Sequence, residues 1–558
     1  MNATQLLPHF DRLAEAPNAV PRLRRFILDL AVRGKLVEQD AGDEPAGELL
    51  KRIYAHKADL VNERLLKVQS AFTAVPLALQ PYRLKSNWMW AFFGSIMISR
   101  DGERIPVSKE ERNTRAKTYD YYGASGVIDK IDGFLFDKPL LLIGEDGANL
   151  INRSTPIAFI ARGQYWVNNH AHVLDGITED FLRYIELYVN AIDLKAYVTG
   201  TAQPKMNQAK MNSIPVAIPP EAEQHRIVAK VDELMALCDQ LEAAQQERER
   251  RRDRLAAASL QRLNQPAADT TPEAQREHAR FHLQHLPHLT TRPEHIKAMR
   301  QLLVNLAVVG KLAQPEPNDE PAEVLLKKVW AEKKSRGLLK QAKESPEGNI
   351  DLIVNSLPAG WAWTTFESFA TEIATGPFGS ALHQSDYIDG GIPLVNPSHM
   401  IDGRIFVNPK ISVSEETAKS LASYRMKSGD VVMARRGEVG RAAIVTDAEA
   451  GWLCGTGSFF VNFHKEIDRQ FVILLLRSDA VRRYLAGEAV GTTMVNLNHG
   501  ILKRIPLALP PAAEQHRIVA KVDELMALCD QLEAQLTTTQ TDSRRLLEAV
   551  LVAALVPV

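Results

Sequence analysis

Two stretches of the chain carry hydrophobic residues at alternating steps of four and three positions. The first stretch begins at Ile227 and the second at Ile518. This spacing keeps apolar side chains on one face of an α-helix and is typical of a coiled-coil seam. Paired prolines, Pro219–Pro220 and Pro510–Pro511, stand just ahead of the two stretches, where a helix tolerates proline. The predicted seam residues are Ile227, Val231, Leu234, Cys238, Leu241, Ile518, Val522, Leu525, Cys529 and Leu532.

Each seam predicts a helix of roughly thirty residues, which would be about 45 Å long at 1.5 Å per residue. Because the two helices are alike, the simplest arrangement pairs them antiparallel within one chain; a homodimerising coiled coil is the alternative. One turn of B-DNA is about 34 Å, so such a rod could hold two domains over successive major grooves. Cys238 and Cys529 occupy seam positions, and we expect them to be buried thiols rather than a redox pair.

Short β-like runs separated by glycine turns fill the segments ahead of the two helices. The first segment spans residues 86–219 and the second spans residues 358–511. Each segment also contains one helical stretch, Phe181–Val198 in the first and Phe471–Ala486 in the second. Mixed strand and helix signals of this kind predict two compact α+β domains.

Internal duplication organises the whole chain. The 22 residues Ala222–Ala243 recur unchanged at Ala513–Ala534. Two further repeats lie upstream: Phe26–Leu36 matches Leu302–Leu312, and Asp43–Ile53 matches Asp319–Val329. A duplicated chain implies two pseudo-symmetric halves. We therefore predict six parts: a helical segment (1–85), a first domain (86–219), a first long helix (220–262), a linker with the repeated helical segment (263–357), a second domain (358–511) and a second long helix (512–558).

Composition sets limits on function. The 558 residues carry a formal net charge of −1 and three cysteines, which excludes a disulfide framework. No run of eighteen apolar residues and no secretory leader is visible, so we expect a cytoplasmic protein. Charge is nevertheless uneven, because eight basic and four acidic residues lie between Arg404 and Arg441. Global neutrality therefore does not exclude binding to DNA.

Signatures of catalysis are missing from the sequence. The two Gly-Lys-Leu triplets lack the upstream glycine and the hydroxyl of a phosphate loop and are expected to be helix ends. Glu145 and Asp146 stand beside a glycine without the Glu-x-Lys partner of a nuclease centre. No aromatic residue follows a Pro-Pro pair to hold a flipped adenine. Four histidines of the linker have near-helical spacing, and a solvated linker face is favoured over a zinc site: His278, His282, His285 and His288.

Polar side chains suited to DNA cluster in both variable domains. Arginine pairs with guanine in the major groove, and asparagine or glutamine pairs with adenine. An ordinary surface or turn role remains the alternative for any single residue. The candidates in the first domain are Arg104, Lys109, Arg115, Lys117, Tyr121, Tyr122, Asn168, Asn169, His170, Gln203, Lys205 and Asn207. Those in the second domain are Ser380, Asn396, Ser398, Arg435, Arg436, Thr492, Thr493, Asn496 and Asn498.

Several phrases resemble those of the specificity subunits of type I restriction–modification systems. The junctions IPPEAEQHRIVAKVDEL from Ile218 and LPPAAEQHRIVAKVDEL from Leu509 are the most specific of these phrases. LPAGWAWTTFESF from Leu357 is similar to the usual opening of a recognition domain. GPFGSAL from Gly376 and YYGASGVID from Tyr121 resemble recurrent phrases inside such domains. The resemblance extends over essentially the whole chain.

This resemblance implies a division of labour. Each recognition domain would read one half of a bipartite, asymmetric DNA site, and the helices would fix the gap between the halves. Two methyltransferase subunits would dock on the chain and use S-adenosylmethionine, and two motor-nuclease subunits would dock on it and use ATP and Mg. The chain itself would bind none of these cofactors and would catalyse no reaction. Two alternatives stay open: the same type of subunit in another methylation-based phage-defence system, and a coiled-coil DNA-binding regulator. The linker between residues 262 and 294 is longer than a minimal connection.

Overall fold

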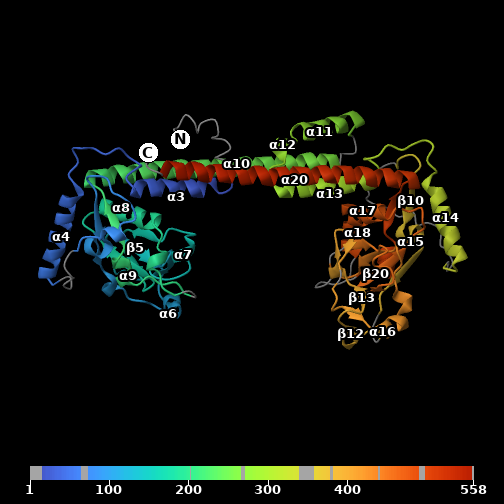
Figure 1. The fold of residues 1–558 in the computed structure, drawn as a ribbon, viewed down its shortest axis with the longest axis horizontal. Coiled ribbons are helices and arrows are strands. Elements are labelled where there is room, and N and C mark those ends of the chain that lie inside the picture. The colour runs from blue at the N-terminus through green and yellow to red at the C-terminus, as the bar shows by residue number, and fades with distance from the viewer. Residues whose placement is uncertain are drawn as a thin grey trace. The chain divides into compact units, whose positions relative to one another are not determined.

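The computed structural model describes residues 16–64, 73–200, 203–264, 270–338, 357–377, 381–406, 408–437, 440–488 and 497–555. They divide into two compact units, residues 1–248 with 540–558 and residues 249–539. Each unit contains one α+β domain together with the helices that cover it (Figure 1). The mixed helix-and-sheet class and the two-part organisation predicted from the sequence are thus confirmed.

A four-stranded antiparallel sheet in the order β2-β8-β5-β6 forms the centre of the first domain. All five residues of the central strand β5 are buried, because alternate side chains enter two different cores. Leu141 and Ile143 pack with the helices, whereas Leu140 and Leu142 face a smaller sheet. The strands of the central sheet are β2 (Ile98–Ser99), β5 (Leu140–Gly144), β6 (Ala158–Ala161) and β8 (Ala171–Asp175). Those of the smaller sheet, in the order β4-β3-β7, are β3 (Tyr119–Gly123), β4 (Gly126–Ile131) and β7 (Tyr165–Val167).

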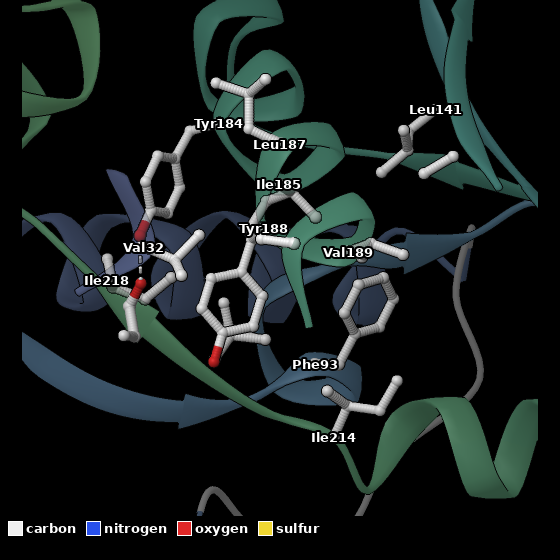
Figure 2. Packing of buried hydrophobic residues seen from close by; sticks show 14 of the residues in the cluster. Val32, Phe93, Leu141, Tyr184, Ile185, Leu187, Tyr188, Val189, Ile214 and Ile218 are labelled. Atoms are coloured by element: carbon white, nitrogen blue, oxygen red, sulfur yellow. Dashed lines mark hydrogen bonds between the residues drawn. The ribbon is translucent and has the colours of Figure 1, made fainter. Parts of the chain in front are cut away.

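Helix α8 (Glu179–Ala191) covers one face of the central sheet β2-β8-β5-β6 and also packs against the last strand of the domain. The helix begins where the Thr178 side chain accepts a hydrogen bond from the backbone N–H of Phe181, a common N-cap arrangement. Figure 2 shows the buried ring of Tyr184 pointing from α8 toward the strand that carries Ile218, where its hydroxyl donates to the carbonyl of Ala217 at 2.7 Å. That strand, β9 (Pro215–Ile218), pairs antiparallel with β1 (Met89–Phe92) and closes the domain.

The main sheet of the second domain has the same topology as that of the first, although the sequences differ. Its strand order is β11-β20-β17-β18. Side chains of the central strand β17 again enter two different cores, Val431 and Met433 in one and Val432 in the other. The strands are β11 (Glu372–Thr375), β17 (Val431–Ala434), β18 (Ala442–Ile444) and β20 (Ser458–Asn462), and the closing pair is β10 (Ala362–Thr365) with β21 (Pro506–Leu509). A further sheet in the order β12-β16-β13-β19 comprises β12 (Tyr387–Ile388), β13 (Ile392–Val395), β16 (Ser412–Val413) and β19 (Leu453–Cys454).

One predicted helix of the second domain is two helices in the structure. The stretch Phe471–Ala486 is divided into α17 (Arg469–Arg477) and α18 (Asp479–Glu488). Ser478 separates them in an extended conformation, and its hydroxyl oxygen accepts from the backbone N–H of Val481. A serine in this role starts a new helix, so the chain turns where the hydrophobic spacing indicated continuity.

The repeated Gly-Lys-Leu triplets lie at helix ends, as predicted. Helix α3 (Ala19–Val32) ends just before Gly34, and α13 (Pro293–Val308) ends just before Gly310. Both glycines have positive φ, +66° and +72°, a left-handed conformation that other residues adopt at a cost. Two further repeated helices follow them, α4 (Ala46–Asn62) and α14 (Ala322–Ser335).

Two 44-residue helices, α10 (Glu221–Asn264) and α20 (Ala512–Leu555), extend over nearly all of the segments 220–262 and 512–558 that were predicted as long helices, beyond the roughly thirty residues estimated from the seam alone. The seam underestimated them because polar segments such as Glu247–Arg254 continue the first helix without apolar spacing, and 44 residues make a helix of about 66 Å. The division between units falls inside both helices, after Arg248 and after Thr539. Each long helix therefore begins in one unit and ends in the other.

The beginning of each seam packs against the domain of its own half. Ile227 and Val231 are buried in the core of the first domain, and Ile518 and Val522 in that of the second. Leu234 and Leu241 are partly buried against the first core, and Leu525 and Leu532 are half-buried. Cys238 and Cys529 are buried free thiols, as expected.

The histidine-rich linker folds into two helices, α11 (Pro272–Gln284) and α12 (Leu286–Leu289). The prediction of a solvated histidine face is wrong for His282, which is buried with its Nδ1 2.9 Å from the hydroxyl of Ser259 on α10. Packing against α10 removes this ring from water, a contact that residue spacing within the linker did not indicate. Among the described residues, no group of three or more His, Cys, Asp or Glu side chains could hold a metal ion. Over the same ranges, no helix has the length and apolar character needed to cross a lipid bilayer.

Candidate nucleic-acid interface

Each domain is attached to its long helix by the same buried pair of side chains. The indole Nε1 of Trp88 donates to Glu223 Oε2 at 3.0 Å, and Trp361 donates to Glu514 Oε2 at 3.0 Å. Both glutamates are 0% exposed in the first turn of their helices. Burial raises the pKa of each carboxyl above its ordinary value. The repeated tryptophans therefore hold two unlike domains on two like helices in the same way.

A repeated ion pair lies beside this contact. Arg226 on α10 binds Asp43 through both terminal nitrogens, at 3.2 and 2.5 Å, and Arg517 on α20 binds Asp319 at the same two distances. The hydrogen bond from Arg226 lowers the pKa of Asp43, as the one from Arg517 does for Asp319. Two-point contacts of this kind fix orientation as well as distance.

A repeated lysine joins the preceding helix to each domain. Lys57 on α4 is 3% exposed and donates to the carbonyls of Gly94, Ser95 and Met97 at 2.8–3.2 Å. Lys333 on α14 donates to the carbonyl of Glu367 in the corresponding place. Burial lowers the pKa of Lys57 to about 8. The scaffold around the domains is thus duplicated down to single side chains.

Three loops meet at one edge of the first domain's sheet. The segment after β5 joins the loop before β8 through the hydrogen bond from Glu145 N to His170 O at 2.8 Å. It joins the loop before α9 (Gln208–Asn212) through Met206 N and Glu145 O, also at 2.8 Å. We call residues 145–147, 168–170 and 203–207 the first loop cluster. It brings together two groups of predicted DNA-binding residues that are some 35 positions apart in the sequence.

Charged side chains hold this cluster rigidly. Arg104 Nη1 donates to Glu145 Oε2 at 2.9 Å and to the carbonyl of Ala171 at 2.7 Å. Lys205 Nζ lies 3.1 Å from Glu145 Oε1. Burial alone would raise the pKa of Glu145, but these cations bring it below its ordinary value. Arg104 and Lys205 therefore support the loops in the free protein.

A buried histidine ring lies beneath the same loops. His172 is 1% exposed, with Nδ1 2.6 Å from Asp101 Oδ2 and Nε2 2.8 Å from the carbonyl oxygen of Met206. Both ring nitrogens face acceptors, so the geometry favours the doubly protonated ring. Burial opposes the charge, yet the Asp101 contact raises the pKa of His172 above its ordinary value.

The second domain builds a loop cluster on the same backbone plan. Arg435, directly after β17, donates its N–H to Gly457 O at 2.8 Å and accepts from Leu497 N at 2.9 Å. These bonds connect the segment after the central strand to the loop before β20 and to the loop before α19 (His499–Lys503). Arg441 Nη1 adds a bond to Pro397 O at 3.2 Å. We call residues 396–399, 435–437, 455–457 and 497–498 the second loop cluster, which unites Asn396, Ser398, Arg435, Arg436 and Asn498.

Several predicted DNA-binding residues have structural roles instead. Tyr121 is 1% exposed and its hydroxyl accepts from Val107 N at 3.0 Å, so the prediction that it touches DNA is wrong. Asn168 is 5% exposed, with its Oδ1 accepting from His170 N at 2.8 Å, and the same correction applies. Tyr121 was selected as an aromatic residue ahead of a glycine turn and Asn168 as an amide suited to adenine, whereas sheet packing buries both side chains.

Other candidates are held by neighbours. Arg115 pairs with Asp132 at 2.6 Å and Lys117 with Asp129 at 2.9 Å. Tyr122 stacks on Phe159 with ring centroids 5.8 Å apart. Asn207, Asn396 and Asn498 accept backbone hydrogen bonds at the starts of short helices. Lys109, Asn169, Gln203 and Ser398 are exposed, and Ser380, Thr492, Thr493 and Asn496 lie outside the described residues.

Asp146 is a cluster residue whose sequence context indicated no more than an incomplete nuclease centre. It lies in the first loop cluster, where its Oδ2 is 2.7 Å from His170 Nδ1. The sequence signal that could have identified Asp146 is its position, because Glu145 and Asp146 directly follow a run of buried apolar residues, as Arg435 and Arg436 do.

Comparison with known proteins agrees with this architecture. The type I restriction modification DNA specificity domain matches residues 85–249 and 372–539. The chain is 28% identical over 580 residues to the type I restriction enzyme EcoEI specificity subunit of Escherichia coli, covering 96% of this chain and 94% of the relative. It is 26% identical to the EcoAI specificity subunit of the same species, with the same coverage.

Solved structures show weaker similarity. The HsdS subunit from Thermoanaerobacter tengcongensis is 16% identical with a TM-score of 0.41, covering 86% of this chain and 99% of that one. The S subunit from M. genitalium is 12% identical with a TM-score of 0.27, at 86% and 97% coverage. The family assignment rests on the domain matches, which together span more than half of the chain. This chain belongs to the type I restriction–modification family of DNA specificity subunits.

Proposed function

We propose that the chain reads a bipartite, asymmetric DNA site, with one half-site for each recognition domain. The observation that carries this proposal is the pair of loop clusters, which share a backbone plan but differ in side chains. The loop after the central strand carries Glu145 and Asp146 in the first domain and Arg435 and Arg436 in the second, and the outer residue of each pair, Asp146 or Arg436, is the one presented. Two domains with opposite charges at equivalent positions are suited to unlike base sequences.

The duplicated scaffold supports a spacing role for the helices. The Trp–Glu, Arg–Asp and lysine contacts recur in both halves. The Trp–Glu contact attaches each domain to the start of its own 44-residue helix. The Arg–Asp pair joins that helix to the segment ahead of α4 or α14, and the lysine joins α4 or α14 to the domain. A fixed attachment of this kind sets the gap between the two half-sites, because helices are stiff over a few tens of ångströms.

The chain itself would act as a non-catalytic subunit in the cytoplasm. Two methyltransferase subunits would dock on its helices and methylate adenine with S-adenosylmethionine, and two motor-nuclease subunits would supply ATP- and Mg-dependent cleavage. None of these cofactors is proposed to bind this chain. The lack of phosphate-loop and nuclease signatures in the sequence supports this division of labour.

Genome-wide mapping of methyladenine tests the proposal. The map is made in cells that express the cognate methyltransferase subunit with and without this chain. We expect a split motif with a fixed gap only when both are present. Methylation that is unchanged by this chain, although the complex assembles, contradicts the proposal.

A further inference from the structure

The position after the central strand is equivalent in the two domains. Glu145 and Arg435 each donate their backbone N–H to the loop before the adjacent strand and accept from the loop before the last short helix. The four distances are 2.8 and 2.8 Å in the first domain and 2.8 and 2.9 Å in the second. Glu145 therefore corresponds to Arg435, and the next residue, Asp146, corresponds to Arg436.

The inner residue of each pair is occupied by the fold. Glu145 is 9% exposed and contacts Arg104 and Lys205. Arg435 donates from Nε to the carbonyl of Leu497 at 3.1 Å. Burial lowers the pKa of Arg435, with the adjacent Arg436 charge adding to the effect. These two side chains fix the loops and are not the groups presented to a ligand.

The outer residue of each pair is presented outward. Arg436 is exposed, and within the described residues its guanidinium has no hydrogen bond or ion pair. The Asp146 side chain is 17% exposed, and its Oδ2 lies 2.7 Å from Nδ1 of the half-exposed His170 ring. In the part of the chain that the structure describes, Oδ1 of Asp146 has no hydrogen-bond partner. Both groups sit on a framework held by the inner residue, so they can meet a base without rearrangement of the loop.

The two groups have opposite hydrogen-bonding chemistry. A guanidinium only donates, in a planar fork that fits O6 and N7 of guanine. A carboxylate only accepts, and its partner in the major groove is the amino group of cytosine. We propose that this position determines base specificity, with Arg436 reading a guanine in the second half-site and Asp146 reading a cytosine amino group in the first. This inference rests on the proposed function.

Substitutions at the two positions, combined with methyladenine mapping, test the inference. Arg436→Ala should make one guanine position of the second half-site degenerate and leave the first half-site unchanged. Asp146→Asn should relax one cytosine position of the first half-site only. For each, we expect discrimination against the wrong base pair to fall by roughly tenfold or more. Matched controls are Arg404→Ala and Asp137→Asn, which change the same charges at other exposed positions and should leave both motifs intact.

A lysine variant separates base reading from phosphate binding. Arg436→Lys keeps the charge but loses the two-point fork. If Arg436 reads guanine, Arg436→Lys should remain degenerate at that position. If Arg436 only contacts phosphate, Arg436→Lys should restore full activity and specificity, and the assignment is overturned.

Purified complex provides the decisive measurement. Binding of the chain with its methyltransferase subunit is measured on a duplex of the mapped motif, with that guanine either natural or replaced by 7-deazaguanine. The wild type should lose affinity for the 7-deaza duplex, whereas Arg436→Ala should bind both duplexes equally. A split wild-type motif that every variant retains overturns the inference and leaves the proposed function intact. A wild type that produces no split motif overturns both.

Discussion

The buried tryptophan–glutamate contact gives a prediction whose size follows from the structure. Trp88→Phe keeps a ring in the core but removes the Nε1 donor that bonds Glu223 at 3.0 Å. Glu223 is fully buried, and among the described residues its Oε1 has no hydrogen-bond partner. Within the part of the chain that the structure describes, Gln39, whose Nε2 is 3.4 Å away, would be the remaining side-chain hydrogen-bond donor to this carboxyl. Removing the donor from a buried charged acceptor costs about 1.5–3 kcal/mol of unfolding free energy.

The duplication supplies an internal comparison. Trp361→Phe removes the same donor from Glu514. Pro315 stands at the position that matches Gln39, so no side-chain amide supports Glu514 there. We therefore expect the second half to lose about 1 kcal/mol more than the first, the typical contribution of one hydrogen bond.

Urea unfolding followed by far-UV circular dichroism measures the total loss for each variant. Hydrogen exchange of β1–β9 peptides and of β10–β21 peptides assigns the loss to one half. Trp88→Phe combined with Glu223→Gln serves as the control, because a neutral amide is less costly to bury without its donor. Losses below about 0.5 kcal/mol in both halves, or losses that Glu223→Gln does not reduce, would refute the reasoning.

Three other outcomes are expected. The pKa of Lys57 is lowered to about 8 in the folded protein, so the unfolded chain binds more protons than the folded chain above that pH. The stability of the first unit should therefore rise between about pH 8 and 10, and Lys57→Met should abolish this rise in pH-dependent thermal melts. The pKa of His172 is raised in the folded protein, so its contribution to stability is complete below about pH 6.5 and is lost as pH rises through the folded-state pKa. His172→Asn should therefore lower the melting temperature most near pH 5–6 and progressively less at higher pH; a melting-temperature difference that does not vary with pH would contradict a charged ring. Ile227→Ala and Ile518→Ala each remove a fully buried side chain and should each cost about 2–5 kcal/mol in denaturant titrations, with equal losses expected if the two seams pack alike.

The hydrophobic pattern predicted the elements whose burial is one-sided. The seam spacing placed two long helices, because steps of four and three are compatible only with a helix that has one apolar face. The pattern stopped short of their ends, since polar turns of a continuing helix carry no such signal. The single helix predicted over Phe471–Ala486 was wrong at Ser478, where one hydroxyl starts a second helix.

Candidate residues were predicted less well than elements. Residue type and neighbouring residues in the sequence suggested that Tyr121 and Asn168 contact DNA, but packing in the sheets buries both side chains. Sequence distance also hid the clusters, because Glu145, His170 and Met206 meet through backbone hydrogen bonds between separate loops. Local sequence does not specify such contacts, which depend on the strand order of the sheet.

The sequence by itself determined the duplication, the two α+β domains, the helix ends at Gly34 and Gly310 and the family resemblance. These features depend on residue identity, periodicity and local backbone preference, all of which are visible along the chain. Tertiary structure alone decided that Asp146 and Arg436 occupy one equivalent position and that Glu145 and Arg435 support them from within. The physical reason is that equivalence between two dissimilar domains is a property of their shared hydrogen-bonded framework, which forms only when strands distant in sequence pair.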